Sequence, residues 1–348
     1  MRTLREKTRL FLNDQALIDK RDMWFERLLN LFEGRPDAYN EKYVFSVHGF
    51  VPRPADESMP YTDPENWVIE CLEMLSDLPE MQRNRFMPLC VEYPIYGVHF
   101  IDKMFGADVF FKDGQWNARY LKTPIGKLEM PDLEKDETWM LARRAAKAFL
   151  DADVKLPLFG LPTLSSALNI MVNLYGGDAL IAMIEDEENA LNDLTVINNL
   201  IRALHKWYLD TIPHKQLQPV ISWERTQPPG FGQLCGCTTQ LLSGKMYERL
   251  IAPLDDQLLS DYPNGGMIHL CGAHSQHIET FRNMKNLRAL QLNDRASHDL
   301  KLYLDGLRED QIIYLAPCEG MSIEKALEIS KGKRIVLPAP INAPEKPL

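Results

Sequence analysis

The chain has 348 residues, of which 45% are hydrophobic and 25% charged, and its formal net charge is −10. This composition is typical of a globular protein with a sizeable core. The acidic balance, without any block rich in Lys and Arg, excludes the basic surface expected of a nucleic-acid-binding protein. No run reaches the roughly 18 apolar residues of a membrane span, and the charged N-terminal stretch lacks the apolar core of a signal peptide. We therefore expect a cytoplasmic protein, not bound to membranes, whose cysteines stay reduced.

The first part of the chain is expected to cap a larger unit. Residues 1–34 have the charge and periodicity of an amphipathic helix that ends at Gly34-Arg-Pro36. The following stretch, 35–135, is rich in Pro and aromatic residues and predicts loops, a small sheet and short helices, with a hairpin at 123–133. Within a single domain covering 1–348, residues 1–135 are thus predicted to form an N-terminal extension that contributes a lid.

Residues 136–348 alternate regularly between short apolar runs and helical patterns. Helices are expected over 136–152, over 166–212 in two or three pieces broken at Gly176-Gly177, and over 243–262 (with Ser243 as N-cap), 276–286, 297–307 and 322–332. Strands are expected over 155–162, 218–224, 265–271, 287–294, 312–318 and 333–340.

This alternation predicts βα units around a parallel sheet. Four or five consecutive units in a chain of this length favour a closed (β/α)8 TIM barrel over an open doubly wound sheet. No Gly-x-Gly-x-x-Gly follows any strand, which argues against a dinucleotide-binding domain. The expected fold class is therefore α/β, a barrel with an N-terminal helical and loop extension.

The stretch GMIHLCGAHSQH (266–277) holds three of the eight histidines of the chain and one of its six cysteines. His269 and Cys271 are two residues apart on an expected strand, so their side chains point the same way. Cys318 ends a strand two βα units later, and a closed barrel brings strand ends to one mouth. One imidazole and two thiolates suit zinc, and three protein ligands leave a position open for chemistry. We therefore predict a zinc site at these three residues.

Other chemistry-bearing residues lie near the expected strand ends. His274 and His277 are interpreted as ordinary loop and helix residues. Cys235 and Cys237 allow a further ligand, a resting-state ligand or a redox pair, but the preferred interpretation is a Gly-containing loop whose two thiols happen to be neighbours. Glu224 is a candidate general base, a displaceable ligand or a salt-bridge partner.

Several segments resemble one enzyme superfamily. HLCG (269–272) followed by LAPCEGMSIEKALEI (315–329) resembles the uroporphyrinogen decarboxylase superfamily, specifically its zinc-dependent branch of methylcobamide:coenzyme M and related corrinoid-linked methyltransferases. Residues 123–129, 159–194 and 241–259 also fit this superfamily, and the resemblance is continuous from about 85 to 330 and weak before that. Two features depart from it: the RQAGRY-like motif of the decarboxylase is absent, and Gly244 stands where Pro is common.

The resemblance implies a (β/α)8 barrel with His269, Cys271 and Cys318 as zinc ligands. It also implies a methyl transfer between a corrinoid, carried on a separate corrinoid protein, and a small-molecule thiol or other heteroatom substrate, in either direction. The zinc site is similar to that of cobalamin-independent methionine synthase, which adds a carboxylate from a neighbouring strand. Asp294 is the nearest equivalent in this chain, and Asn293 is the alternative.

Two other functions remain open from the sequence: a metal-free decarboxylase or lyase on the same barrel, and a non-enzymatic corrinoid- or metal-binding accessory protein. In the lid, His48, Tyr93, Tyr96 and His99 are candidate pocket residues, with ordinary packing as the alternative for each. The oligomeric state is not predicted.

Overall fold

Most strands of the protein run parallel to one another in two sheets. The computed structural model describes residues 3–35, 43–47, 52–53, 62–77, 88–162, 165–219 and 225–339. The larger sheet has six parallel strands in the order β1-β11-β10-β9-β8-β7. These strands are β1 (Tyr43–Val47), β7 (Gly232–Cys235), β8 (Gly266–Cys271), β9 (Leu287–Asn293), β10 (Ile312–Leu315) and β11 (Ile335–Ala339).

The second parallel sheet is shorter and has the order β2-β5-β6. Its strands are β2 (Cys90–Glu92), β5 (Leu158–Gly160) and β6 (Leu217–Gln218). The prediction of an α/β fold with parallel strands is confirmed. Among the described residues no pairing joins β6 to β7 or β1 to β2, so closure into a barrel stays a prediction.

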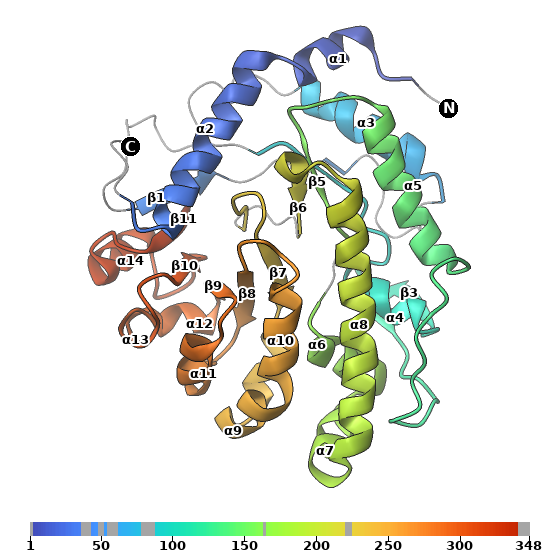
Figure 1. The fold of residues 1–348 in the computed structure, drawn as a ribbon, viewed down its shortest axis with the longest axis vertical. Helices are drawn as coiled ribbons and strands as arrows, with labels where there is room; N and C mark the ends of the chain where they lie inside the picture. Colours follow the sequence, from blue (N-terminus) through green and yellow to red (C-terminus); the bar gives the residue numbers. More distant parts are fainter. Residues whose placement is uncertain are drawn as a thin grey trace.

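Helices surround the strands (Figure 1). The α-helices before β6 are α1 (Glu6–Leu12), α2 (Gln15–Phe32), α3 (Pro64–Ser76), α4 (Phe100–Met104), α5 (Glu137–Asp151), α6 (Ala167–Tyr175), α7 (Gly177–Glu185) and α8 (Glu187–Thr211). Those after β7 are α9 (Gly244–Met246), α10 (Ala252–Leu259), α11 (Ile278–Asn283), α12 (Arg295–His298), α13 (Leu300–Gly306) and α14 (Ile323–Ser330). Short 3₁₀ helices are η2 (Gly97–His99), η3 (His214–Gln216), η4 (Cys237–Leu241) and η6 (Ser275–His277), and η5 (Tyr247–Ile251) is a π-helix.

The expected helix pattern is confirmed at its breaks and caps. The predicted break falls at Gly176, whose φ of 62° is costly for any residue with a side chain. A Cβ there would also lie 2.6 Å from the Tyr120 ring. Ser243 caps α9, since its side chain accepts a hydrogen bond from Met246 N.

One hairpin prediction is wrong. The described hairpin pairs β3 (Val109–Lys112) with β4 (Gln115–Ala118), whereas 123–133 forms turns without strands. Asp113 and Gly114 both have positive φ, the conformation of a tight two-residue hairpin turn. The 123–133 segment is held differently, because the buried Asp193 carboxylate accepts hydrogen bonds from Gly126 N and Leu128 N.

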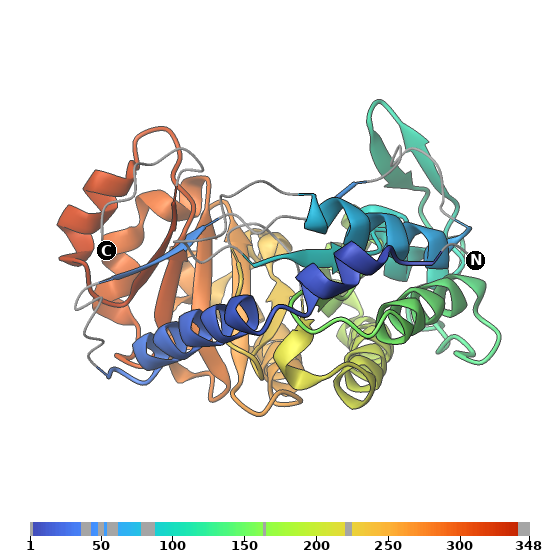
Figure 2. The ribbon, with the colours of Figure 1, turned by 90° about the horizontal axis from the view of Figure 1, so that it is seen from above.

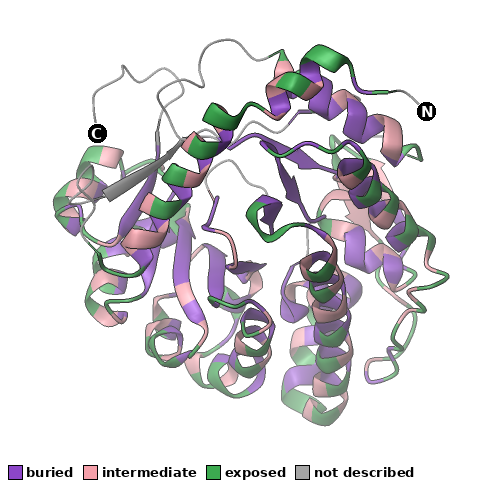
Figure 3. Cartoon of the chain, turned by 45° about the horizontal axis from the view of Figure 1, so that its top comes forward, coloured by how far each residue is buried: buried purple, intermediate pink, exposed green. Residues whose placement is uncertain are grey.

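The amino ends of the strands share a core with α2. Strand residues from both sheets pack with α2 in one buried cluster, whose members are Trp24, Phe25, Leu28, Phe32, Cys90, Leu158, Phe231, Met267, Ala289, Ile312, Tyr314 and Val336. Helix α2 runs along the sheets in the view from above (Figure 2), and the strands between the helices are mostly buried (Figure 3). Helix α2 covers the amino ends of the strands. The lid predicted for residues 1–135 stays a prediction.

No single helix in the described part of the chain is long and apolar enough to cross a bilayer. Helices α6 and α7 meet the length and composition test only as a pair, and that pair is bent by 111°.

Candidate metal centre

The candidate site lies where β7 and β8 end. Their parallel register sets Cys235 opposite His269, and the register between β8 and β9 sets Cys271 opposite Asn293. Because side chains alternate along a strand, His269 and Cys271 share one face of β8, as the sequence predicts. The carboxyl ends of neighbouring parallel strands therefore bring thiols and an imidazole together.

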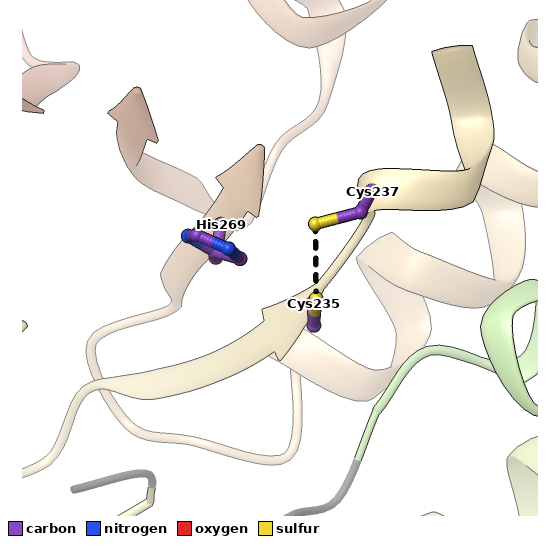
Figure 4. A group of neighbouring side chains, drawn as sticks. All are labelled: Cys235, Cys237 and His269. Atoms are coloured by element: carbon purple, nitrogen blue, oxygen red, sulfur yellow. Dashed lines mark hydrogen bonds between the residues drawn. The ribbon is translucent and has the colours of Figure 1, made fainter. Parts of the chain in front are cut away.

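Four side chains form what we call the thiol–imidazole cluster: Cys235, Cys237, His269 and Cys271. Ligand atoms of Cys235, Cys237 and His269 all lie within 4.8 Å of one another, and all three residues are buried or half-buried (Figure 4). The Sγ atoms of Cys235 and Cys237 are 3.3 Å apart, and Cys271 Sγ is 3.0 Å from His269 Nε2. All six cysteines are free.

Hydrogen bonds within the cluster distribute its protons unevenly. Hydrogen bonding to Cys237 lowers the pKa of Cys235 and the pKa of Cys271. The same interactions with Cys235 and Cys271 raise the pKa of Cys237. Nearby His269 lowers the pKa of Cys235 and Cys271 further. A cation bound between these sulfurs would favour the thiolate forms of Cys235 and Cys271 in the same direction.

The donor set fits zinc. Three sulfurs and one nitrogen are its usual ligands, and a tetrahedral site with Zn–S bonds of about 2.3 Å separates two sulfurs by roughly 3.8 Å. The Sγ atoms of Cys235 and Cys237 are 3.3 Å apart, which is slightly closer than that spacing. Small side-chain rotations suffice to reach it.

His269 is held in the tautomer that a metal ligand needs. Its Nδ1 is hydrogen-bonded to Gln291 Oε1. An amide oxygen only accepts, so Nδ1 donates this hydrogen bond, and Nε2 is the ring nitrogen directed at Cys271. Metal-ligating histidines commonly donate their second ring N–H to an oxygen in this way.

Two asparagines and a glycine support the cluster from outside. Asn169 Nδ2 donates to Cys235 Sγ over 3.4 Å, and its Oδ1 accepts from Thr238 N, which ties α6 to the turn after β7. Asn293 Nδ2 lies 3.5 Å from Cys271 Sγ. Gly236, between the two cysteines, has no room for a side chain, because a Cβ would lie 2.8 Å from Ile268 Cγ2.

Cys318 lies in the turn that follows β10. Strand β10 ends at Leu315, and Cys318 sits three residues later in a turn closed by its backbone pairing with Met321. Its Sγ points to the carbonyl oxygens of Asp294 and Glu319, at 3.4 and 3.6 Å. The three-residue ligand set found in the described part of the chain does not include it. Its role as a zinc ligand stays a prediction.

Asn293 and Asp294 differ in their position relative to Cys271. Asn293 ends β9 next to Cys271, while Asp294 follows in an exposed turn with a φ of 49°. A catalytic role for Asp294 remains untested.

His274 and His277 make hydrogen bonds to the backbone. His274 Nε2 is 2.7 Å from Cys271 O, and its Nδ1 is 3.0 Å from Thr239 Oγ1. His277 Nε2 is 2.9 Å from Thr239 O. Both rings are buried, and burial lowers the pKa of each. The interpretation of both as ordinary loop and helix residues, without a metal, stays a prediction.

The candidate lid residues are placed only in part. Tyr93 is buried against Trp67, and Tyr96 packs edge-on against Trp116. His99 is half-buried and bonded to Asp102. His48 and Glu224 lie outside the described residues, so their predicted roles stay predictions.

The fold is similar to that of a methyltransferase from Methanosarcina mazei. The TM-score is 0.61 over 90% of this chain and 92% of that chain, at 12% sequence identity. At such low identity the likeness concerns the fold alone. No family model matches the chain, and no curated protein matches it either.

Strand β7, which positions Cys235, is missing from the strands predicted from the sequence. The run GFGQLC (230–235) is short and glycine-rich, and no strand is predicted there from the sequence. The strand predicted over 218–224 overlaps β6 at Gln218, and residues 220–224 lie outside the described residues. A strand ending at Cys235 would have placed Cys235 beside His269 in a parallel sheet.

Proposed function

We propose that the protein is a zinc-dependent methyltransferase that moves a methyl group between a corrinoid, carried on a partner protein, and a thiol or other heteroatom substrate. The observation that carries this proposal is the thiol–imidazole cluster at the carboxyl ends of β7 and β8, which is where parallel α/β folds hold their reacting groups. The fold likeness to a methyltransferase and the sequence resemblance point to the same reaction class.

The proposal includes closure of the two parallel sheets into one (β/α)8 barrel. Support comes from the shared core at the strand starts, where Cys90 and Leu158 of the smaller sheet pack with Met267 and Ala289 of the larger one. A barrel would bring the carboxyl ends of β2 and β5 to the same mouth as the cluster.

In this function, Cys235, Cys237 and His269 would hold the metal, with Cys271 beside His269. Bound zinc supplies a Lewis acid that keeps a substrate thiol as thiolate at neutral pH or polarises a methyl donor. Gln291 fixes the ligating nitrogen of His269, and the N–H groups of Asn169 and Asn293 are directed at the sulfurs of Cys235 and Cys271. Hydrogen bonds of this kind reduce the charge that the thiolates place on the site.

A second candidate is a structural metal site. All four cluster residues together make a Cys₃His set, which is typical of closed structural zinc sites, whereas catalytic sites keep one position open for substrate.

The first test measures zinc by metal analysis in the purified protein, Cys237→Ser and the matched control Cys318→Ser. We expect about one zinc per chain in the wild type and in Cys318→Ser, and little in Cys237→Ser. Loss of zinc only in Cys318→Ser would favour the set His269, Cys271 and Cys318 instead.

The second part of the test follows methyl transfer in both directions, with methylcobalamin and a panel of thiols. Wild type should react and Cys237→Ser should lose at least about 100-fold in rate. A zinc-loaded protein that transfers no methyl group, and whose melting temperature falls steeply when zinc is chelated, would support the structural site instead.

A further inference from the structure

A second pair of chemistry-bearing side chains lies just beyond the carboxyl end of β2. His99 ends η2, and its Nδ1 is 2.5 Å from Oδ2 of Asp102, on α4. Asp102 is fully buried, while the His99 side chain keeps 14% of its exposure. Among the described residues His99 Nε2 has no hydrogen-bond partner, so this nitrogen is available to a ligand.

Asp102 is fixed by a hydrogen bond from a neighbouring helix. Asn173 Nδ2 donates to Asp102 Oδ2 over 3.0 Å, and Asp102 Oδ1 has no hydrogen-bond partner within the described part of the chain. Leaving a buried carboxylate oxygen unpaired is costly. The backbone before His99 is also unusual, since Tyr96 has a φ of 58° without being glycine. Such conformations persist mainly where function requires a fixed geometry.

Helix α6 connects this pair to the thiol–imidazole cluster. Asn173 contacts Asp102, and Asn169, four residues earlier, contacts Cys235. Residues four apart lie on one face of a helix and are about 6 Å apart along its axis. Because α6 packs against both α4 and η4, the His99–Asp102 pair and the cluster contact the same helix about one turn apart.

Among the described residues, the other charged groups close to η2 lie near Tyr96. The Lys103 ammonium lies over the Tyr96 ring, 5.7 Å from its centroid. Burial raises the pKa of Tyr96, and the negative charge of Glu137 on α5 raises it further. The strand β4 packs against η2 with the neutral Trp116, and α6 contributes the neutral Asn173. Asp102 is therefore the carboxylate in direct contact with the imidazole.

We propose that His99 is the proton-transfer residue for the substrate that binds at the thiol–imidazole cluster, and that Asp102 is its positioning residue. The inference rests on the proposed function and adds that the substrate carries an exchangeable proton on its reacting heteroatom, as a thiol does. As the thiol binds, its S–H bond breaks and an N–H bond forms at His99 Nε2. Asp102 stabilises the resulting imidazolium, which later returns its proton to solvent. In the reverse direction the imidazolium protonates the demethylated heteroatom.

The test counts protons released when a simple thiol, 2-mercaptoethanol, binds to the zinc-loaded protein. Calorimetric titrations at pH 8 in two buffers with different ionisation enthalpies give this count. Histidine side chains are ordinarily neutral at this pH and can take up a proton. Wild type should release fewer protons than His99→Gln, in which no imidazole can take the proton of the bound thiol and about one proton per thiol should reach the buffer.

Asp102→Asn supplies a second variant that keeps the imidazole but removes the negative charge beside it. It should also release close to one proton. Equal counts in wild type and both variants, with unchanged zinc content and melting temperature, would overturn the role of His99. If wild type binds zinc and folds but binds no thiol, this inference fails, whereas the proposed function fails only if no methyl transfer to or from any heteroatom substrate is found.

The values of kcat and KM distinguish a role in proton transfer from a purely structural role. With a thiol that wild type methylates, His99→Gln should lower kcat about 100-fold with little change in KM, and the deficit should shrink for thiols of low pKa. A change confined to KM would contradict a role in proton transfer.

Discussion

His205, on α8, is a buried histidine that the candidate function does not use. Its Nδ1 is hydrogen-bonded to the Tyr262 hydroxyl, and its Nε2 has no partner among the described residues. Burial lowers the pKa of His205 to about 4. The folded protein therefore holds this ring neutral, whereas in the unfolded chain it takes up a proton near pH 6.5.

The sign of the pH effect follows. Because the folded pKa lies below the unfolded one, stability is full above about pH 6.5 and is lost as the pH falls toward 4. Between pH 7 and pH 5 the contribution of His205 should fall by about 2 kcal/mol. Urea unfolding of wild type and His205→Gln at both pH values measures it as the difference between their free energies of unfolding.

Asp255 acts in the opposite direction and provides the control. Burial raises its pKa to about 7, so its stability contribution is present at low pH and is lost as the pH rises toward 7. In wild type the pH-dependent contributions of His205 and Asp255 to the free energy of unfolding have opposite signs and partly cancel. We expect Asp255→Asn to become less stable on acidification and His205→Gln to become more stable; parallel pH profiles in all three proteins would contradict the assignment.

At the level of elements, the turn after β7 decides the geometry of the cluster. Gly236 N donates to His269 O over 2.8 Å, which fixes the turn against β8. Because a Cβ at Gly236 would meet Ile268, Gly236→Ala should push β7 and β8 apart. We expect it to cost about 1–3 kcal/mol of unfolding free energy and to weaken zinc binding.

The matched control is Gly177→Ala, at the start of α7, where nothing lies within 4 Å of the added Cβ. Urea unfolding and a chelator competition for zinc compare the two variants. If Gly236→Ala behaves like Gly177→Ala in both measurements, the turn does not depend on this close approach.

On the scale of the whole molecule, α2 closes the end of the strands opposite to the candidate site. Leu28 is fully buried in the core that α2 shares with both sheets. Leu28→Ala should therefore cost about 2–5 kcal/mol of unfolding free energy and leave zinc content unchanged in the folded protein. Leu10→Ala, at an exposed leucine of α1, is the control and should cost little. A small effect of Leu28→Ala would contradict a core shared by the two sheets.

Element type followed largely from the sequence because it depends on local patterns. The periodicity of 166–212 predicted helices broken at Gly176, and the apolar runs at 265–271 and 287–294 predicted β8 and β9. The hairpin was misplaced because its signal is a single Asp113-Gly114 turn, while Pro124 and Gly126 made the later segment look similar.

The sequence by itself determined that His269 and Cys271 share one face of a strand, since that depends only on alternation along the chain. Only the tertiary structure decided which other thiols approach them. Strand register placed Cys235 opposite His269 and brought Cys237 beside it, whereas β10 ended three residues before Cys318. Contacts between strands depend on register and on where each strand stops, and both are set by packing across the whole fold rather than by local sequence.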